Sequence, residues 1–496
     1  MVRTPVSFVV GVCLVATLQA VPAGAAPAGT AAQDQRRSTK VAMPAPDGRL
    51  SSYVVNAAGP WRSNTTKVAR AVRRNGGTVV ETWPEIGVVV AHSRESGFRR
   101  AMRRRDVVAS VGMTRTTRVS EGTPGTARSR AAAGGVPEKA EFRPATRAQV
   151  EPDPREAKQW DMRVIRADEA HEVTDGSPDV LVGVLDSGIE HDHPDLAENI
   201  DAASSVNCTD AGAVDTSARG WRPTTSDHGT HVAGTIAAAR NGTGIVGVAP
   251  NARLASVKVV NDDGYIYPEY AVCGFMWSGR QGMDVTNNSY YVDPFMYWCD
   301  DRPDQAAAMA AVSRAVRWST KQGVTHVAAA GNASTDLDRN SFDSSSPNDS
   351  RSVNRRINAG CRDLPTELPG VVTVSSFARI KKTLRTKASF FTNVGLRAID
   401  VAAPGSNILS TVLDGRYARF SGTSMASPHV AGVVALLLSE HPDLTPAQVR
   451  EAIRAMAKDK PCRKAQFDAL PRCRGNDARN SYAGEGMVDA LRAVRP

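Results

Sequence analysis

Short apolar segments recur from about residue 153 to the end of the chain, and longer amphipathic or loop segments separate them. Five of these apolar segments are typical of strands: VLVGVLD, LASVKVV, MDVTNNS, VTHVAAA and VVTVSS. Strands that alternate with helical segments pair in parallel, and helices then cover both faces of the sheet. The sequence therefore predicts an α/β domain with a doubly wound parallel sheet over residues 153–496, with active residues at the carboxyl ends of its strands.

A smaller pattern lies upstream, where SSYVVNA, TVVETW, IGVVVAH and VVASVGM are typical of strands and helical stretches are expected near residues 66–74 and 95–105. This β-α-β-β-α-β order predicts a small α+β domain over residues 48–113. Residues 114–150 lack apolar periodicity and have the composition of a linker. The polar stretch 334–356 is expected to be a long surface loop.

Charge divides the chain near the same boundary. Residues 1–150 contain 23 Lys and Arg and 9 Asp and Glu, a net charge of +14, whereas residues 151–496 have a net charge of −4. The overall charge of +10 raises the alternative of a nucleic-acid-binding protein. No zinc-finger, RNP or helix-turn-helix pattern accompanies that charge, and the larger part of the chain is acidic. We therefore expect no nucleic acid as a partner.

The N-terminus carries an export pattern. Arg3 precedes an apolar run at residues 6–20, and the tripeptide Ala-Gly-Ala at residues 23–25 fits an A-x-A cleavage site. A transmembrane anchor is the alternative, but this run is shorter than the roughly 20 residues that a bilayer-spanning helix needs. Residues 1–26 are therefore predicted to be a signal peptide, which implies a secreted, extracellular protein without a membrane anchor.

Six cysteines remain beyond the predicted signal peptide, and an even number favours disulfides in an exported chain. No Cys-x-x-Cys pair argues for zinc. Six cysteines allow fifteen connectivities, and the sequence leaves the choice open. Closeness along the chain favours the pairs Cys462 with Cys473 and Cys273 with Cys299.

Three segments place a reactive side chain at a strand end or at a helix start. VLVGVLDSGIE places Asp186 at the end of a buried strand, SDHGTHVAGTIAAA places His228 at the start of an Ala-rich helix, and FSGTSMASPHVAGVV places Ser424 just ahead of a long apolar helix. Asp186 alone is explained by a turn, and Ser424 alone by a helix N-cap. Together the three supply the carboxylate, imidazole and hydroxyl that a serine nucleophile requires.

Asn332, in VTHVAAAGNAS, follows an apolar strand and a glycine. Attack by Ser424 would create an oxyanion, and the Asn332 amide with the Ser424 backbone N–H at a helix start would supply donors for it. A structural Asn in a turn is the alternative. For His228 and His231, which share a helix face, zinc is the alternative, but no Glu stands near them as in a metalloprotease helix.

These segments resemble the subtilisin-like serine proteases, the subtilase family (peptidase family S8). Asp-Ser-Gly at Asp186, His-Gly-Thr-His at His228, Ala-Ala-Gly-Asn at Asn332 and Gly-Thr-Ser-Met-Ala-Ser-Pro at Ser424 match the family's motifs in the family's chain order. The resemblance implies a subtilisin-like fold and a serine endopeptidase that forms an acyl-enzyme. In it Ser424 is the nucleophile, His228 the general base, Asp186 the orienting carboxylate and Asn332 an oxyanion donor.

The domain at 48–113 resembles the inhibitor-type propeptide that precedes many of these enzymes. The resemblance implies that this domain assists folding, blocks the cleft and is then removed, so that the chain is an autoprocessed preproenzyme with a processing site in the 114–150 linker. The charges of +14 and −4 would draw the two parts together. The alternative is that the arginines form a solvated surface.

The resemblance also assigns a substrate groove. Tyr291 stands where the family usually has Gly, so a preference for large apolar side chains is not carried over. One wall is expected to consist of Ser289, Tyr290 and Tyr291, and the opposite, smaller wall of Ala329, Ala330 and Gly331.

A structural calcium site is implied as well, whereas no cofactor is expected for catalysis. Asp195 in HDHPDL stands at the position of a family calcium carboxylate, and the loop ARNGTGI offers Asn241 and main-chain carbonyls. The alternative is an ordinary Asn-Gly turn.

The expected partners are protein or peptide substrates and the chain's own propeptide as an intramolecular inhibitor, and the protein is expected to be a monomer. The alternative function is that of a catalytically silent subtilase-fold binding protein.

Overall fold

The computed structural model describes residues 37–43, 48–122, 152–462 and 470–495. The chain divides between Arg37 and Ser38, and every element described below lies on the C-terminal side of that division. The predicted signal peptide and residues 123–150 of the predicted linker lie outside the described residues.

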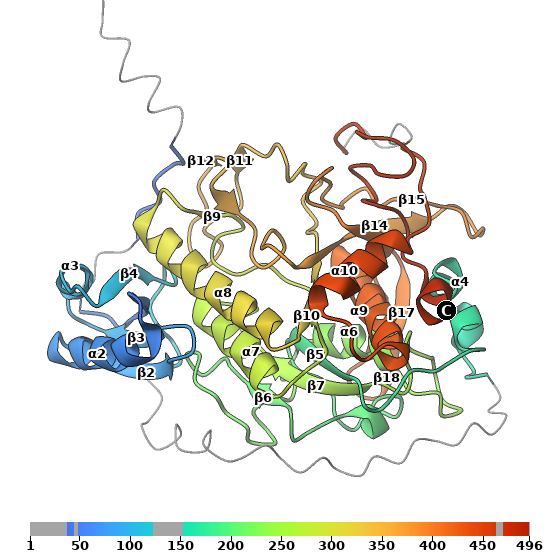
Figure 1. Cartoon of the computed structure of the whole chain (residues 1–496), viewed down its shortest axis with the longest axis horizontal. Helices are drawn as coiled ribbons and strands as arrows, with labels where there is room; N and C mark the ends of the chain where they lie inside the picture. The colour runs from blue at the N-terminus through green and yellow to red at the C-terminus, as the bar shows by residue number, and fades with distance from the viewer. Residues whose placement is uncertain (1–36, 44–47, 123–151, 463–469, 496) are drawn as a thin grey trace, which may run out of the picture. The chain divides into compact units, whose positions relative to one another are not determined.

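The upstream domain is a four-stranded antiparallel sheet in the order β2-β3-β1-β4, with two helices against it (blue in Figure 1). Tyr53, Val72 and Phe98 belong to its buried apolar cluster. The predicted β-α-β-β-α-β order is confirmed. The elements are β1 (Ser51–Ala57), α2 (Trp61–Arg74), β2 (Gly77–Trp83), β3 (Val88–Ser93), α3 (Phe98–Arg103) and β4 (Val108–Met113).

An eight-stranded sheet forms the centre of the larger domain. Its strands run in the order β15-β14-β10-β8-β5-β7-β6, β16 also pairs with β14, and every pair is parallel except β14 with β15. The strands are β5 (Leu181–Asp186), β6 (Val206–Asn207), β7 (Arg253–Lys258), β8 (Val285–Asn288), β10 (Thr325–Ala329), β14 (Val372–Arg379), β15 (Thr386–Ala388) and β16 (Val401–Pro404).

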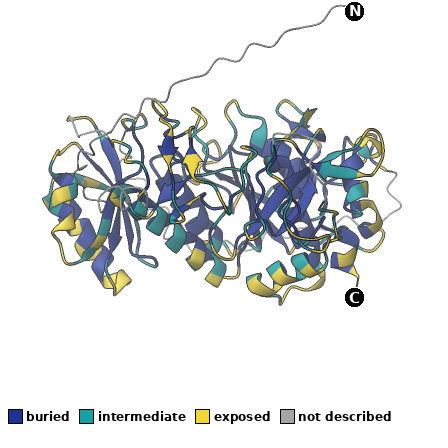
Figure 2. Cartoon of the chain, turned by 90° about the horizontal axis from the view of Figure 1, so that it is seen from above, coloured by how far each residue is buried: buried dark blue, intermediate teal, exposed yellow. Residues whose placement is uncertain are grey.

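Alternate residues of β5 face different layers of helices. Val182 and Val184 belong to the apolar cluster that contains residues of α6 (His228–Ala237) and α9 (Thr423–Glu440). Leu181 and Leu185 belong to the cluster that contains residues of α7 (Pro268–Arg280) and α8 (Pro303–Lys321). Because successive side chains of a strand point to opposite faces, both faces of the sheet are covered. The predicted doubly wound α/β fold is confirmed (Figures 1 and 2).

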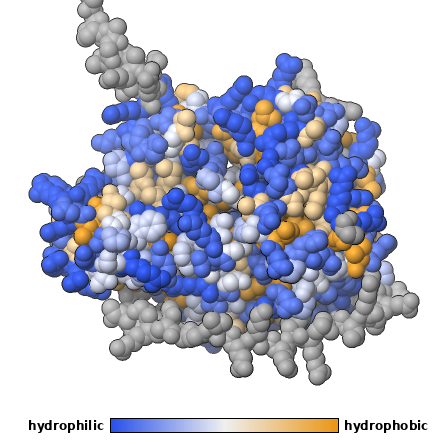
Figure 3. All heavy atoms as spheres, in the orientation of Figure 1, coloured by the Kyte–Doolittle hydropathy of each residue, from blue (hydrophilic) through white to orange (hydrophobic). Residues whose placement is uncertain are grey.

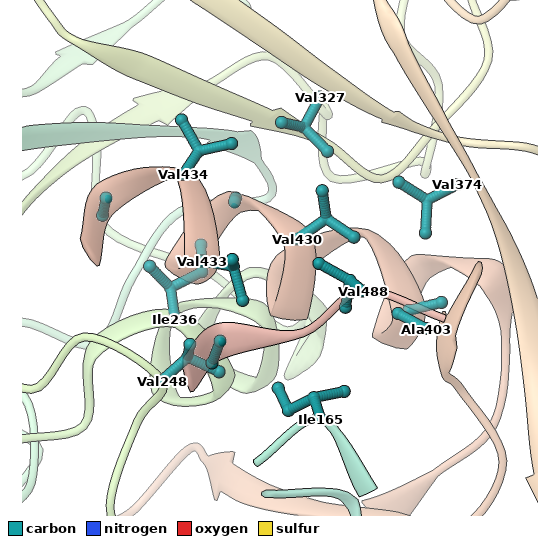
Figure 4. Packing of buried hydrophobic residues seen from close by; sticks show 14 of the residues in the cluster. Ile165, Ile236, Val248, Val327, Val374, Ala403, Val430, Val433, Val434 and Val488 are labelled. Atoms are coloured by element: carbon teal, nitrogen blue, oxygen red, sulfur yellow. The ribbon is translucent and has the colours of Figure 1, made fainter. Parts of the chain in front are cut away.

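Helix α9 is apolar around its whole circumference, which is typical of a helix enclosed by other elements. Figure 4 shows Val430 and Val434 of α9 near Val327 and Val374 of the sheet, and Val433 on the side of α6. The helices of this domain are α4 (Trp160–Val164), α5 (Ala167–Ala170), α6 (His228–Ala237), α7 (Pro268–Arg280), α8 (Pro303–Lys321), α9 (Thr423–Glu440), α10 (Pro446–Ala455) and α11 (Ala490–Val494). Within the described ranges, no helix combines the length and apolarity that a bilayer crossing requires.

Three small strand pairs lie outside the main sheets, namely β9 (Trp298–Cys299) with β13 (Cys361–Arg362), β11 (Phe342–Asp343) with β12 (Arg355–Arg356), and β17 (Ile408–Val412) with β18 (Arg416–Phe420). The prediction of a surface loop over 334–356 is therefore partly wrong. Arg355 and Asp343 form an ion pair of 2.7 Å with both side chains fully buried. Because the two charges compensate each other, both side chains can be buried. The polarity of the sequence therefore does not reveal that part of this stretch is buried.

Sequence separation predicts the pairing of the cysteines only in part. The predicted pair of Cys462 with Cys473 is confirmed. The predicted pair of Cys273 with Cys299 is wrong, since Cys273 bonds Cys208 and Cys299 bonds Cys361. The antiparallel pairing of β9 with β13 places Cys361 directly opposite Cys299.

Candidate active site

The carboxyl end of β5 and the start of α6 bring Asp186 and His228 together. Asp186 is the last residue of β5 and His228 is the first of α6. Nδ1 of His228 lies 2.8 Å from Oδ1 and 3.0 Å from Oδ2 of Asp186. The backbone N–H of Ser187 donates to Asp186 Oδ1 at 2.7 Å. This arrangement favours a proton on Nδ1 and leaves Nε2 of the imidazole available as a base.

The carboxylate also sets the charge state of the imidazole. Burial alone would lower the pKa of His228, but the negative charge of Asp186 and its hydrogen bond raise it above its ordinary value. The neighbouring Gly229 allows the close approach, because a Cβ there would collide with the carbonyl oxygen of Gly188 and contact Asp186.

Ser424 is the second residue of α9, and Ser289 holds it at the end of β8. Ser424 Oγ donates to the carbonyl oxygen of Ser289 at 3.2 Å, and Ser289 Oγ donates to the carbonyl oxygen of Ser424 at 2.9 Å. Asn287 supports this exchange, because its amide donates to Ser289 Oγ at 2.8 Å. Among the described residues, the recorded acceptor of the Ser424 hydroxyl is thus Ser289 and not His228. Hydrogen bonds between a nucleophile and its base are often long in a free enzyme and tighten when substrate binds.

Hydrogen bonds to its amide oxygen orient the Asn332 side chain. Its Oδ1 accepts from the backbone N–H of Thr423 at 2.8 Å and from Thr423 Oγ1 at 3.0 Å. A Cβ built on Gly422 would lie 3.6 Å from Asn332 Nδ2 and 3.6 Å from the backbone nitrogen of Ser424. The two donors therefore lie within 3.6 Å of one common point.

Asn393 holds the loop that carries Asn332, and the sequence reasoning missed it. Its Oδ1 accepts from the backbone N–H groups of Ala333 and Thr335, each at 3.0 Å, and its Nδ2 donates to the carbonyl oxygen of Ala330 at 2.8 Å. Asn393 is 1% exposed. No sequence pattern points to this role, because its partners lie some 60 positions earlier in the chain.

The two predicted walls of the groove leave neighbouring strands. Strands β8 and β10 pair in parallel, with Asn288 opposite Ala328. The segments that follow them therefore leave the same edge of the sheet side by side. They contain Ser289, Tyr290 and Tyr291 on one side and Ala329, Ala330 and Gly331 on the other.

Both tyrosines of the first wall are held at their hydroxyl groups. Tyr290 donates to Asn288 Oδ1 at 3.1 Å, and Tyr291 accepts from Asn348 Nδ2 at 3.1 Å. Burial raises the pKa of Tyr290 and of Tyr291, so both phenols stay protonated. The ring of Tyr291 is thus held at its hydroxyl, and its effect on the substrate groove stays a prediction.

The loop predicted to hold calcium contains two incompletely bonded buried carboxylates. Asp195 Oδ2 accepts from the N–H of Ile245 at 2.9 Å, while its Oδ1 has no recorded partner among the described residues. Asp153, which the sequence analysis did not select, accepts from the N–H of Gly242 at 2.7 Å through Oδ1, and its Oδ2 is equally without a recorded partner in that part of the chain. Burial raises the pKa of Asp195 to about 7 and that of Asp153 to about 6.

Asn241 is engaged within its own turn. Its Oδ1 accepts from the N–H of Thr243 at 3.1 Å and its Nδ2 donates to the carbonyl oxygen of Pro194 at 3.0 Å. Over the described ranges no cluster of three or more His, Cys, Asp or Glu side chains suits a metal ion. A hard cation here would depend on Asp195, Asp153 and main-chain carbonyls.

His231 is a structural residue of the core. It is fully buried, its Nε2 lies 3.1 Å from the carbonyl oxygen of Ile408, and its ring stacks on Phe420 with 4.4 Å between centroids. Burial lowers the pKa of His231 to about 3, so the imidazole is neutral. Nothing in this environment supports the zinc alternative.

Comparison with known proteins matches this site and fold. The sequence profile of the subtilase family matches residues 177–482. Subtilisin DY of Bacillus licheniformis is 32% identical over 294 residues, which are 59% of this chain and 89% of that protein. Subtilisin NAT of Bacillus subtilis subsp. natto is 34% identical over 293 residues, which are 59% of this chain and 64% of that protein.

A solved structure supports the fold. The epidermin leader peptide processing serine protease of Staphylococcus aureus superposes with a TM-score of 0.64 at 20% identity, covering 90% of this chain and 98% of that chain. The matched segment 177–482 contains Asp186, His228, Asn332 and Ser424. The chain therefore belongs to the subtilase family and is a subtilisin-like serine protease.

Proposed function

We propose that the chain is a secreted serine endopeptidase in which Ser424, His228 and Asp186 form the catalytic triad and Asn332 completes the oxyanion hole. The observation that carries this proposal is the 2.8 Å contact between His228 Nδ1 and Asp186 Oδ1, next to the end of β8 where Ser289 contacts Ser424. The alternative, a catalytically silent binding protein of this fold, would lack one of these four groups.

In the proposed reaction, Ser424 Oγ leaves its contact with Ser289 and attacks the carbonyl carbon of the scissile peptide bond. His228 Nε2 takes the hydroxyl proton, and Asp186 stabilises the imidazolium that forms. The oxyanion accepts hydrogen bonds from Asn332 Nδ2 and from the Ser424 backbone N–H. His228 then gives its proton to the leaving amine, and water, activated by the same imidazole, hydrolyses the acyl-enzyme.

We also propose that residues 48–113 are an inhibitory propeptide. Contacts with the first turns of α7 and α8 support this role. Ser52 Oγ donates to Glu269 at 2.8 Å, and the guanidinium of Arg115 pairs with the same carboxylate. Asp304 accepts from Arg99 at 2.6 Å and from the N–H of Met113 at 3.1 Å. The helix dipole also stabilises carboxylates in the first turn of a helix. Glu269 and Asp304 therefore keep this stabilisation when residues 48–113 are removed.

The basic charge of this domain lies on its outer surface as well as at the contact. Figure 3 shows hydrophilic residues dense over the region of α2 and α3. At the contact, Arg99 and Arg103 pair with Asp304, and Arg115 pairs with Glu269 and is 1% exposed. Some arginines of this region therefore pair with acidic residues at the contact, and others belong to the solvated surface.

Processing is proposed to occur in the linker at 114–150. Its first residues stay close to the body of the protein, since Thr116 donates through its backbone N–H to Asp349 at 2.8 Å and Val119 donates to Leu50 at 3.0 Å. Residues 123–150 lie outside the described residues. Cleavage there would separate the basic domain from the protease domain.

A structural Ca²⁺ is proposed where Asp195 and Asp153 meet the loop 239–245. Each carboxylate has one buried oxygen without a recorded partner within the described residues, and a cation would compensate both charges. Asn241 is proposed to contribute only after its turn with Thr243 opens, because its Oδ1 is already used.

A fluorophosphonate probe tests the enzymatic proposal. Secreted protein freed of residues 48–150 is expected to be labelled on Ser424, and Ser424→Ala protein is expected to stay unlabelled. A folded wild-type protein that neither reacts with the probe nor cleaves any member of a mixed peptide library would instead support the silent binding protein.

A further inference from the structure

Residues 363–366 connect the two walls of the groove from beneath, and we call them the floor segment. The N–H of Val292, just past Tyr291, donates to the carbonyl oxygen of Leu364 at 2.8 Å. On the opposite side, Thr366 Oγ1 donates to the carbonyl oxygen of Ala329 at 2.9 Å. The floor segment is thus hydrogen-bonded to both walls, and its first residue is Asp363.

Asp363 is a buried carboxyl group directed towards the second wall. It is 2% exposed, and a Cβ built on Gly331 would lie 3.9 Å from its Oδ2. Its Oδ1 is buried and has no hydrogen-bond partner among the described residues. Gly331 directly precedes Asn332, so this carboxyl lies beneath the residue next to the proposed oxyanion donor.

No cation of the described chain compensates Asp363 within ion-pair distance. The nearby Arg355 pairs with Asp343, and the exposed Arg362 donates to the carbonyl oxygen of Glu367 at 3.3 Å. Burial raises the pKa of Asp363 well above its usual range, and the negative charge of Glu367 adds to the effect. A buried carboxyl with one unbonded oxygen and no paired cation is costly, and such groups are typical of sites where a ligand supplies the missing charge.

Glu367 faces a different space. It lines a cavity of about 740 Å³ together with Asp400 and Arg450, and Asp363 is not part of that lining. The Glu367 carboxylate also accepts from the N–H of Asp363 at 2.7 Å. Glu367 therefore supports the floor segment from behind, while Asp363 is the acid nearest to Gly331.

We propose that Asp363 is the specificity-determining residue of the pocket for the substrate side chain that precedes the scissile bond, and that it selects Lys or Arg there. The proposal rests on the proposed function, because the Asn332 amide must bind the scissile carbonyl for the adjacent side chain to enter beside Gly331. Ala329 and Ala330 are small, and a Lys or Arg side chain can bury its methylene groups while its charge meets the carboxyl. The ion pair then stabilises the ionised form of a carboxyl that has no paired cation in the free protein.

The test measures kcat/KM of the processed enzyme on matched peptide anilides with Arg, Lys or Leu before the scissile bond. We expect the wild type to favour Arg and Lys over Leu by about 100-fold, and Asp363→Asn to remove most of that preference while Leu cleavage changes by less than about threefold. Glu367→Gln keeps a hydrogen-bond acceptor and removes the other nearby carboxylate, so it serves as the matched control. It is expected to leave the ratio of Arg to Leu cleavage unchanged.

The outcomes separate this inference from the proposed function. A wild-type enzyme that reacts with a fluorophosphonate but prefers Leu, or an Asp363→Asn variant that loses cleavage of all three substrates equally, would overturn the pocket and assign Asp363 a structural role. Failure of the wild type to react with the probe would overturn the proposed function itself. Should Asp363→Asn not fold, inhibition of the wild type by peptide aldehydes with a terminal arginine or phenylalanine still decides, and stronger inhibition by phenylalanine would contradict the pocket.

Discussion

Ser289 and Ser424 exchange hydrogen bonds, each side-chain hydroxyl donating to the main-chain carbonyl oxygen of the other, at 2.9 and 3.2 Å. The exchange joins the end of β8 to the first turn of α9. It positions the Ser424 backbone N–H as well as its hydroxyl. Asn332 and His228, which are proposed to act together with Ser424, determine the first two predictions.

Asn332→Ala is expected to lower kcat by about 100- to 1000-fold with a much smaller change in KM. The amide contacts the oxyanion only as the carbonyl carbon becomes tetrahedral, so its loss affects the transition state more than substrate binding. Steady-state kinetics on a single anilide substrate measure both constants. A rise in KM at unchanged kcat would show that Asn332 binds ground-state substrate instead.

The activity is expected to fall as pH decreases through a midpoint above 6.5. Only the neutral imidazole accepts the Ser424 proton, and Asp186 raises the pKa of His228 above its ordinary value, so the active form is already lost at mildly acidic pH. The dependence of kcat/KM on pH gives this midpoint. Asp186→Asn removes the charge and should move the midpoint down while kcat falls by about 10⁴-fold; an unmoved midpoint would contradict the assignment.

Arg115→Met is expected to destabilise the unprocessed chain by about 3 kcal/mol. It leaves the buried carboxylate of Glu269 without its cation, and a broken buried pair costs more than the pair contributes. The comparison uses a Ser424→Ala background so that the chain stays intact, with urea unfolding as the measurement. The exposed Arg118→Met is the matched control and should change stability by less than about 0.5 kcal/mol. Equal effects of the two substitutions would argue against a charge-specific interface.

Chelation is expected to lower the melting temperature of the processed protein by about 5 °C. Loss of a bound cation removes ligand-linked stability and leaves the oxygens of Asp195 and Asp153 without compensation. Differential scanning calorimetry with and without EDTA measures the shift, and added CaCl₂ should restore it. Asp195→Asn protein should no longer respond to EDTA. An identical melting curve for the wild type in both buffers would remove calcium from the account.

The long strands and the reactive residues could be predicted from the sequence because each carries a local pattern. β5 and β10 are short segments rich in apolar residues and are buried along their whole length, as expected for strands buried on both faces. Asp186, His228 and Ser424 each stand next to glycine-containing turns or helix starts that can be recognised along the chain. The two-residue strands β9 and β13 have no such pattern, so the bond of Cys299 with Cys361 could not be inferred from spacing.

Residues whose role depends on distant parts of the chain escaped prediction. Asn393 holds a loop that ends long before it, Asp153 meets Gly242 across the calcium loop, and Asp363 lies under Gly331. The nearest available signal for Asp363 was its acidic company with Glu367 in RDLPTELPG, directly before the strand VVTVSS. Two acidic residues so close to a buried strand are unusual, but only the tertiary fold shows that Asp363 lies near Gly331 of the second wall.

The central claim is that Ser424 is the nucleophile of a self-processing enzyme, and the intact Ser424→Ala chain tests it most directly. Mass spectrometry of the secreted product should find the wild type cut within residues 114–150, and the variant uncut after incubation in isolation, with turnover of added peptide reduced by about a million-fold. Removal of residues 48–113 by the isolated Ser424→Ala protein itself would contradict the account.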